Sequence, residues 1–169
     1  MRDRFELREF VVGDAPGVTR MLHRAYAELG EQGLRFAAID QDEATTLERA
    51  SGGSSWVLTD GGDIVATMTI TYPPELSIQR MSREARVPGR TWLNQLAVDP
   101  GHRGEGLASR LWAVGRRWSR SVGASHVGLN TAIPAASLIE LYEHWGFRRC
   151  ETIQWPTKPY PSTVMLLAL

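Results

Sequence analysis

A segment that passes from a strand through a glycine-containing loop into an amphipathic helix is the feature that most constrains the fold of this chain. Residues Thr91–Val98 read as a strand, which ends at Asp99–Gly101. After Gly106, apolar residues recur at helical spacing from Leu107 to Val122, and Gly123 ends the predicted helix. Such a strand–loop–helix unit is a building block of mixed α/β domains.

The rest of the chain supplies further strands and helices on both sides of this unit. Their order is strand, two helices, three strands, helix, strand, helix and two strands, which predicts a mixed α/β sheet with helices on both faces. The predicted strands are 5–12, 56–59, 64–71, 91–98, 126–130, 147–155 and 163–169, and the predicted helices are about 15–29, about 40–50, 107–122 and 134–145.

Two connections carry specific expectations. Asp14 is expected to cap the first helix, which Gly30 should end. Between two β-rich segments, Gly61 and Gly62 supply the positive φ angles of a tight hairpin turn. The polar segment from Tyr72 to Arg90 is too long for a plain turn and is expected to be a loop that contributes to binding specificity.

Length and composition restrict the class of protein. The 169 residues suit one domain, 1–169, and 19 basic residues balance 19 acidic ones. A zero net charge gives no general attraction to nucleic acid or to an anionic membrane. No apolar run approaches the roughly 20 residues of a membrane span. A single cysteine, Cys150, excludes an internal disulfide, so a cytoplasmic protein is expected.

The loop before the third predicted helix has the composition of an anion site. The first turn of a helix has unpaired backbone N–H groups and a positive dipole end. Gly104 and Gly106 would let a phosphate approach the backbone, and five arginines against one glutamate lie between Gly101 and Arg120. The simpler alternative is a glycine turn before a surface helix with solvated arginines. The glycine spacing fits neither the dinucleotide fingerprint nor the phosphate loop of nucleotide hydrolases.

Two motifs together resemble the GCN5-related N-acetyltransferase (GNAT) family. The segment Arg103-Gly-Glu-Gly106-Leu-Ala108 follows Leu96-Ala97-Val98-Asp99-Pro100, and this is similar to the family's Arg/Gln-x-x-Gly-x-Gly/Ala signature after its apolar-Val-x-Pro strand end. Downstream, Leu141-Tyr142-Glu-His-Trp-Gly146-Phe147 resembles a second family hallmark. The order of elements matches over nearly the whole chain.

The resemblance implies a fold and a cofactor. The fold is a mixed, mostly antiparallel sheet of six to seven strands with about four helices, splayed between the fourth and fifth strands. The cofactor is acetyl-coenzyme A, whose pantetheine arm would fill the opened gap near Leu129, while its pyrophosphate would lie on the loop amides. The cofactor-binding residues implied are Leu96, Ala97, Val98, Arg103, Gly104, Glu105, Gly106, Leu107, Ala108 and Ser109.

The resemblance also implies direct transfer of acetyl from the thioester to an amine. A backbone N–H around Leu96–Val98 would stabilise the oxyanion, and Tyr142 would protonate the departing thiolate. A phenol with a pKa of about 10 is protonated at neutral pH and suits this role. The alternative is that Tyr142 is a core residue of an amphipathic helix.

The general base is not evident from the sequence. The strand before the loop has Trp92, Asn94 and Gln95 and no carboxylate, and Asn130 lies where other relatives carry a glutamate. Ala135 replaces an asparagine that is common in the family. The remaining candidates are a water chain or Glu75, Glu84 and His126, whereas His102, Glu143 and His144 are expected to be structural or solvated.

The acceptor is expected to be a small amine or a protein amine, but the sequence does not identify it. The activity also has alternatives. A non-catalytic sensor of acyl-coenzyme A and an O-acetyltransferase or longer-chain acyltransferase fit the same scaffold. Four arginines between Arg80 and Arg90 suit an acceptor with a carboxylate or phosphate, or are merely solvated. Trp92 is expected in the core, as most tryptophans are, or on the acceptor side of its strand, as the resemblance implies. No metal site is expected, Cys150 is read as a strand residue, and a homodimer is the commonest assembly.

Overall fold

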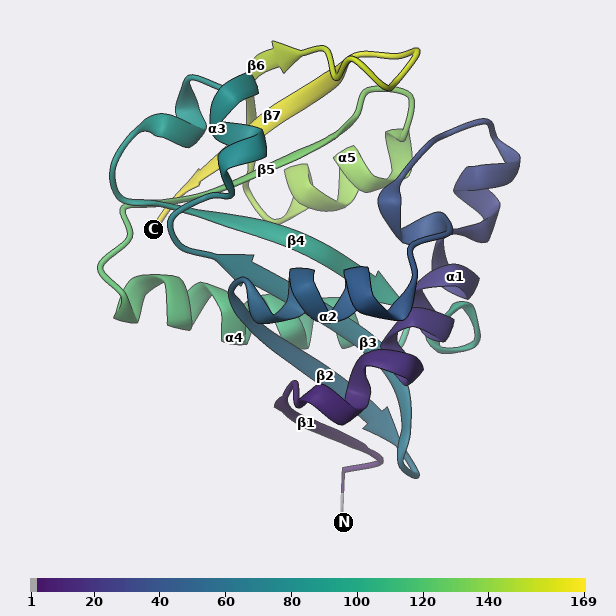
Figure 1. Cartoon of the computed structure of the whole chain (residues 1–169). Helices are drawn as coiled ribbons and strands as arrows, with labels where there is room; N and C mark the ends of the chain where they lie inside the picture. Colours follow the sequence, from purple (N-terminus) through teal and green to yellow (C-terminus); the bar gives the residue numbers. More distant parts are fainter. Residues whose placement is uncertain (1–2) are drawn as a thin grey trace. The chain divides into compact units, whose positions relative to one another are not determined.

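Residues 3–169, which the computed structural model describes, form strands and helices interspersed along the chain (Figure 1). The strands are β1 Phe5–Glu9, β2 Ser54–Asp60, β3 Asp63–Thr71, β4 Arg90–Val98, β5 His126–Ala132, β6 Arg148–Ile153 and β7 Ser162–Ala168. The α-helices are α1 Ala15–Glu31, α2 Glu43–Ser51, α3 Leu76–Met81, α4 Leu107–Ser121 and α5 Ala136–His144. Short 3-10 turns are η1 Val12–Asp14, η2 Ala37–Ile39, η3 Glu84–Arg86 and η4 Pro100–His102.

The strands form one sheet in the order β1-β2-β3-β4-β5-β7-β6. Strands β1 and β2, β2 and β3, β5 and β7, and β6 and β7 pair antiparallel. Strands β4 and β5 pair in parallel, and their register joins Arg90–Trp92 to His126–Gly128. The predicted mixed, mostly antiparallel α/β fold is therefore confirmed. The short parallel register, which ends at Trp92 and Gly128, agrees with the predicted splay.

The chain divides into two compact parts, which are described separately. The first contains the described residues up to Ile70 together with Asn94–Gly115, and the second contains Thr71–Leu93 and Arg116–Leu169. Strands β3 and β4 and helix α4 contribute residues to both parts. That the whole chain folds as one domain stays a prediction.

In the first part, β2 and β3 bury their two faces against different helices. Val57 of β2 lies in a cluster with Met21 of α1, and both side chains are fully buried. Met68 and Ile70 of β3 pack against α4 at Gly115, where an added Cβ would come within 2.5 Å of Met68 Cε and 2.6 Å of Ile70 Cδ1. Neighbouring strand residues point to opposite faces, so α1 and α4 cover opposite faces of this part of the sheet.

In the second part, a tryptophan side chain determines how the strands pack. The side chain of Trp92 is buried, and its ring lies over Gly128 of β5, where a Cβ would come within 2.2 Å of Trp92 Cζ3. Ile78 of α3 and Val164 of β7 complete the same cluster. Gly128 is therefore required by the close approach of this ring, a common reason for a glycine inside a strand.

The segment predicted as an irregular loop contains regular structure. Helix α3 and turn η3 lie between Tyr72 and Arg90, and the prediction of a loop was wrong for these residues. Glu151 of β6 accepts hydrogen bonds from Ser82 Oγ at 2.7 Å and from the Arg83 N–H at 3.0 Å. A contact between residues distant in sequence thus fixes this segment, which local sequence patterns do not reveal.

The first strand and the first helix differ from the prediction at their ends. β1 is shorter than predicted because the Asp14 carboxylate accepts hydrogen bonds from the Val11 N–H at 2.8 Å and from Arg8 at 2.7 and 2.8 Å, which closes a 3-10 turn. The Asp14 side chain makes no cap bond to α1. The helix continues through Gly30, and the glycine with a positive φ, of 83°, is Gly33.

The remaining turn predictions agree with the structure. Gly61 and Gly62 have φ angles of 58° and 97° in the β2–β3 hairpin. Gly123 and Gly146, which follow α4 and α5, have φ angles of 80° and 98°. The second helix starts later than predicted, at Glu43, because the Asp42 carboxylate caps it by accepting from the Thr45 N–H at 2.8 Å.

Candidate functional site

The glycine loop of the first part is held at its start by Asp99. Its carboxylate accepts from the Gly101 N–H at 3.0 Å and pairs with Arg24 at 2.6 Å, and its own N–H donates to the carbonyl of Val65 at 2.8 Å. Pro100 then starts the short turn η4. These contacts fix the point at which the chain leaves β4 and turns towards α4.

Gly104 and Gly106 both adopt left-handed backbone conformations. Their φ angles are 80° and 76°, values that residues with side chains rarely adopt. A Cβ built at either position meets no atom within 4 Å. No atom of the described chain therefore fills the space beside these glycines, and both are exposed next to the start of α4.

The backbone N–H groups of this loop are available to a ligand. The first helical N–H with a carbonyl partner is that of Arg110, which donates to Gly106 O at 3.1 Å. Within residues 3–169, no hydrogen bond donated by the N–H groups of Arg103–Ser109 is found. Leu107 is buried, which anchors the helix, while the residues around it from Arg103 to Gly106 are exposed. This is the arrangement expected of an anion site at a helix N-terminus.

The charged side chains of the loop are engaged with the protein. Arg103 donates to the carbonyl of Ala25 at 3.0 Å and to Glu28 at 3.4 Å. Arg110 pairs with Asp3 at 2.9 Å. Arg103 and Arg110 were expected to add positive charge to the site, and their ion pairs reduce that contribution. The loop amides are thus the main candidate donors for an anion.

The end of β4 is organised by two residues, Tyr26 and Gln41, that the sequence analysis did not select. The buried hydroxyl of Tyr26 donates to the carbonyl of Leu96 at 2.8 Å, and burial raises the pKa of Tyr26 to about 12, so it remains a donor. Gln95 has a φ of 50° and its Oε1 accepts from Gln41 at 2.9 Å. Ala97 is buried against α1. A lone tyrosine on an amphipathic helix looks like a core residue, so only the fold reveals its contact with Leu96.

In the second part, Tyr142 lies on α5 among aromatic side chains. Tyr142 is 6% exposed. Its ring contacts the rings of Trp145 and Phe147 edge-on, with distances between ring centroids of 5.9 and 6.0 Å. The burial of Tyr142 agrees with a core tyrosine and with a desolvated proton donor. Its assignment as the acid therefore stays a prediction.

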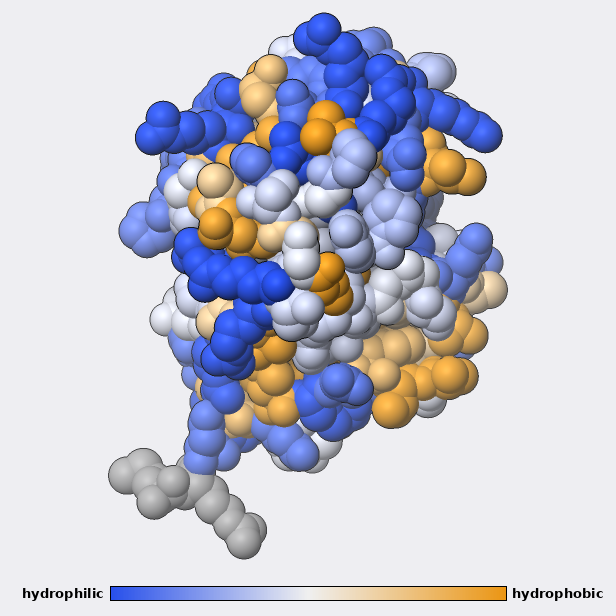
Figure 2. Space-filling view, turned by 90° about the vertical axis from the view of Figure 1, so that its left-hand side faces the viewer, coloured by the Kyte–Doolittle hydropathy of each residue, from blue (hydrophilic) through white to orange (hydrophobic). Residues whose placement is uncertain are grey.

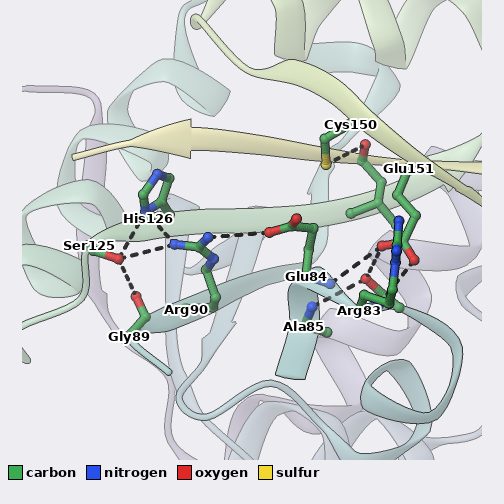
Figure 3. A network of polar contacts seen from close by, with 11 residues as sticks. Arg83, Glu84, Ala85, Gly89, Arg90, Ser125, His126, Cys150 and Glu151 are labelled. Atoms are coloured by element: carbon green, nitrogen blue, oxygen red, sulfur yellow. Dashed lines mark hydrogen bonds and ion pairs between the residues drawn. The ribbon is translucent and has the colours of Figure 1, made fainter. Parts of the chain in front are cut away.

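The candidate bases of the second part are engaged or exposed. Figure 3 shows Arg90 between Glu84 and His126; it donates to Glu84 at 3.2 Å and to the Nδ1 of His126. Burial, assisted by the charge of Arg90, lowers the pKa of His126, so its ring is neutral at pH 7 with Nδ1 as a hydrogen-bond acceptor. Glu75 is exposed on the segment before α3. His126 and Glu84 thus serve a structural network around Arg90.

The other ionisable candidates have structural contacts or raised pKa values. His102 lies 3.4 Å from Asp60, and Glu143 pairs with Arg149 at 2.9 Å. Cys150 is exposed as a residue, but its partly buried thiol donates to the carbonyl of Val164 at 3.4 Å. Desolvation of the sulfur and nearby carboxylates raise the pKa of Cys150 to about 11, so the thiol is protonated at neutral pH.

Neither a metal cluster nor a membrane-spanning helix is found in the described part of the chain. No group of three His, Cys, Asp or Glu residues among residues 3–169 has the geometry to hold a metal ion. None of the helices there combines the length and apolar character needed to cross a bilayer. On the face shown in Figure 2, hydrophobic residues form several separate groups among hydrophilic ones.

Comparison with known sequences gives consistent matches. A sequence model of the acetyltransferase (GNAT) family matches residues 18–147. S-(2-succino)cysteine N-acetyltransferase of Bacillus subtilis (strain 168) is 29% identical over 151 residues, which cover 88% of this chain and 86% of that protein. N-acetyltransferase family 8 member 2 of Rattus norvegicus is 32% identical over 102 residues, which cover 57% of this chain and 39% of that protein.

Solved structures share the fold at low sequence identity. Ard1 from Thermoplasma volcanium superposes with a TM-score of 0.75 at 17% identity, covering 99% of both chains. The protein yncA from Salmonella typhimurium, solved with its cofactor acetyl-CoA, superposes with a TM-score of 0.72 at 15% identity, covering 99% of this chain and 95% of that one. These likenesses support the fold described above.

Proposed function

Because the chain belongs to the acetyltransferase (GNAT) family, we propose that it is an N-acetyltransferase that moves acetyl from acetyl-CoA directly to an amine. The observation that carries the proposal is the row of N–H groups from Arg103 to Ser109 at the start of α4, which donate no hydrogen bond within residues 3–169 and which begin in the exposed loop Arg103–Gly106. Backbone donors with a positive dipole end suit a diphosphate. Bound acetyl-CoA would supply the activated acyl group as a thioester.

The residues of β4 and the loop are assigned to binding and to oxyanion stabilisation. We assign Leu96, Ala97 and Val98 to the pantetheine arm through their backbone groups, and a backbone N–H of this stretch to the developing oxyanion. The Tyr26 hydroxyl, which holds the Leu96 carbonyl at 2.8 Å, fixes the orientation of this peptide group. Arg103–Ser109 are assigned to the diphosphate.

Proton transfer is assigned to Tyr142 and to water. The Tyr142 hydroxyl donates a proton to the departing thiolate, whose pKa is near the roughly 8.5 of a thiol. The attacking amine loses a proton, and with Glu84 paired to Arg90 and no carboxylate along β4, we assign its removal to solvent water. The result is an amide and a free thiol, with protons balanced.

The acceptor we propose is a small amine of the amino-acid class. The Bacillus subtilis relative, which aligns with 88% of this chain, is named for S-(2-succino)cysteine. An S-substituted cysteine is therefore the first acceptor to test, followed by other α-amino acids, their decarboxylated amines and a peptide N-terminus.

Release of the coenzyme A thiol tests the proposal, with product mass as the check on acetylation. We expect turnover with at least one amine of this panel. In Tyr142→Phe we expect kcat to fall about 100-fold, as for loss of a general acid, while the Kd for acetyl-CoA measured by calorimetry changes less than about 2-fold. Tyr160→Phe is the matched control, because Tyr160 is also buried, at 8% exposure against 6% for Tyr142, and should keep its kcat.

The same measurements separate the alternative of a non-catalytic sensor of acyl-coenzyme A. The engagement of Glu84 with Arg90 and of Glu151 with Ser82 favours this alternative, since neither carboxylate is free to act as a base. Tight cofactor binding without thiol release from any amine would support the sensor. Absence of binding would overturn both functions.

A further inference from the structure

A hydrogen bond between two side chains of the second part fixes the orientation of an amide. The indole Nε1 of Trp92 lies 3.0 Å from Oδ1 of Asn130. An indole N–H can only donate, so the atom that it contacts must be the carbonyl oxygen of the Asn130 amide. The two N–H bonds of Asn130 Nδ2 therefore point away from Trp92.

Two residues of β5, Gly128 and Asn130, make the hydrogen bond from Trp92 possible. The ring of Trp92 reaches Asn130 because Gly128 has no side chain, and a Cβ there would lie 2.2 Å from Trp92 Cζ3. Asn130 lies two positions after Gly128 and so points to the same face of β5, opposite Val164 of β7. It also lies two residues beyond Gly128, the last β5 residue in the parallel register with β4.

The donor group of Asn130 has no partner within residues 3–169. Among the hydrogen bonds found for residues 3–169, none is donated by Asn130 Nδ2. The residue is partly exposed, so a ligand or water can reach it. A donor pair that is rigidly aimed and unoccupied suits an oxygen acceptor, above all a charged one.

A second donor, for which residues 3–169 supply no partner, lies next to the cluster around Trp92. Trp155 packs against this cluster, and its Nε1 is buried and makes no hydrogen bond within the described chain. The loop that carries Trp155 is fixed by Gln154, whose amide donates to the carbonyls of Lys158 at 2.7 Å and Tyr160 at 3.1 Å. Two donors in this region, Asn130 Nδ2 and Trp155 Nε1, thus have no hydrogen-bond partner among residues 3–169.

We propose that Asn130 binds the acyl acceptor, with Nδ2 donating to a carboxylate oxygen that the acceptor carries beside its amine, and that Trp92 is the positioning residue for this amide. The proposal rests on the proposed function and deepens it, because it names the residues that recognise the carboxylate of an α-amino-acid acceptor. Arg90, a half-buried cation of this region, is not the carboxylate partner, since Glu84 and His126 already engage it.

The test uses pairs of acceptors that differ only in the carboxylate. Each α-amino acid that the wild-type protein acetylates is compared with its decarboxylated amine. Asn130→Asp keeps an oxygen for the Trp92 N–H and the shape of the side chain, but it replaces the donors by a negative charge. We expect the KM for the amino acid to rise about 10-fold or more, with kcat and the KM for acetyl-CoA within about 3-fold. The KM for the decarboxylated amine should change less than about 2-fold.

A second variant and a second readout guard against a folding defect. Trp92→Phe keeps an aromatic ring over Gly128 but removes the N–H that orients the amide. It should therefore raise the KM for the amino acid less than Asn130→Asp does, and it should likewise leave the KM for the decarboxylated amine nearly unchanged. In the wild-type protein, the side-chain ¹⁵N–¹H₂ signal of Asn130 should shift on addition of the amino acid and not on addition of its decarboxylated amine.

Three results would overturn the inference. A wild-type preference for decarboxylated amines, or an equal rise of KM for both members of a pair in Asn130→Asp, would exclude Asn130 as the carboxylate partner and leave the acetyltransferase assignment intact. Absence of thiol release from every amine would overturn this inference together with the proposed function.

Discussion

Gly106 and Gly128 are both required by the structure, but for opposite physical reasons. Gly106 precedes α4 with a φ of 76°, and a Cβ there would meet nothing within 4 Å. Gly128 lies inside β5 without a positive φ, and a Cβ there would overlap the ring of Trp92 at 2.2 Å. The first glycine leaves room beside the backbone, whereas the second is covered by the protein's own side chain.

This difference separates the proposed ligand site from a packing site. At Gly106 the open space adjoins N–H groups for which residues 3–169 supply no partner, so a bound anion would provide the missing acceptor. At Gly128 the space is filled, and the filling ring in turn orients the amide of Asn130 at 3.0 Å. A substitution at Gly106 should therefore change mainly the affinity for the ligand, and one at Gly128 mainly the free energy of unfolding.

Gly128→Ala is the substitution with the largest expected effect. The added methyl overlaps Trp92, which is buried and cannot move without disturbing its cluster, so we expect a loss of about 2–3 kcal/mol in the free energy of unfolding. Urea denaturation measures it. The double variant Gly128→Ala with Trp92→Leu should lose less than the sum of the two single losses, because the smaller side chain relieves the overlap. Additive losses would show that the ring is not the obstacle.

Gly106→Val should weaken coenzyme A binding about 30-fold, or about 2 kcal/mol, because the side chain covers the loop amides. Gly123→Val is the matched control, since Gly123 has a φ of 80° and equally open surroundings. Both variants should lose about 1–2 kcal/mol in the free energy of unfolding through backbone strain. Calorimetry should find coenzyme A affinity reduced in Gly106→Val alone, and an equal reduction in both would argue against the amide site.

Glu151→Gln should make the folding stability of the protein less sensitive to acid. Desolvation raises the pKa of Glu151, but hydrogen bonds from the Arg83 N–H, Ser82 and the Glu84 N–H outweigh it, so the folded-state pKa is lowered. The stabilisation is therefore present above the unfolded-state pKa of about 4.3 and is lost as the pH falls through the folded-state value. Because Glu151 is partly exposed, we expect about 1 kcal/mol or less. Urea midpoints between neutral and acid pH should fall less steeply in Glu151→Gln than in the wild-type protein.

Arg103→Gln should have the smallest effect on coenzyme A binding. The guanidinium already bonds to Ala25 O and Glu28, so its loss should weaken coenzyme A affinity less than about 3-fold, or about 0.6 kcal/mol. Titration calorimetry at two salt concentrations measures this. A loss as large as that of Gly106→Val would mean that side-chain charge, rather than the backbone, binds the anion.

Several elements of the fold were predictable because their signals are local. The left-handed turns at Gly61, Gly62 and Gly146 follow from adjacent residues, and the structure confirms them. The glycine loop before α4 was located by the same kind of signal together with the motif around Arg103. The contacts that reduce its side-chain charge, such as Arg103 with Glu28, join residues far apart in sequence and were not predictable.

Helix α3 shows the limit of local reasoning. Its residues were read as part of a polar loop, yet Ile78 is buried in the Trp92 cluster and Glu151 of β6 holds the following turn. A helix this short is stabilised by its packing rather than by propensity, so its formation depends on partners that only the fold brings near.

The sequence by itself determined the strand–loop–helix unit, the family and the candidate residues from Leu96 to Ser109. Hydrophobic periodicity, turn-forming residues and motif spacing all depend on a few neighbouring residues, so the sequence shows them directly. Only the tertiary structure decided that Tyr26 holds Leu96, that the loop arginines are paired, and that Trp92 aims Asn130 across Gly128. Those outcomes depend on distances between side chains that are tens of residues apart, which packing sets and no local pattern encodes.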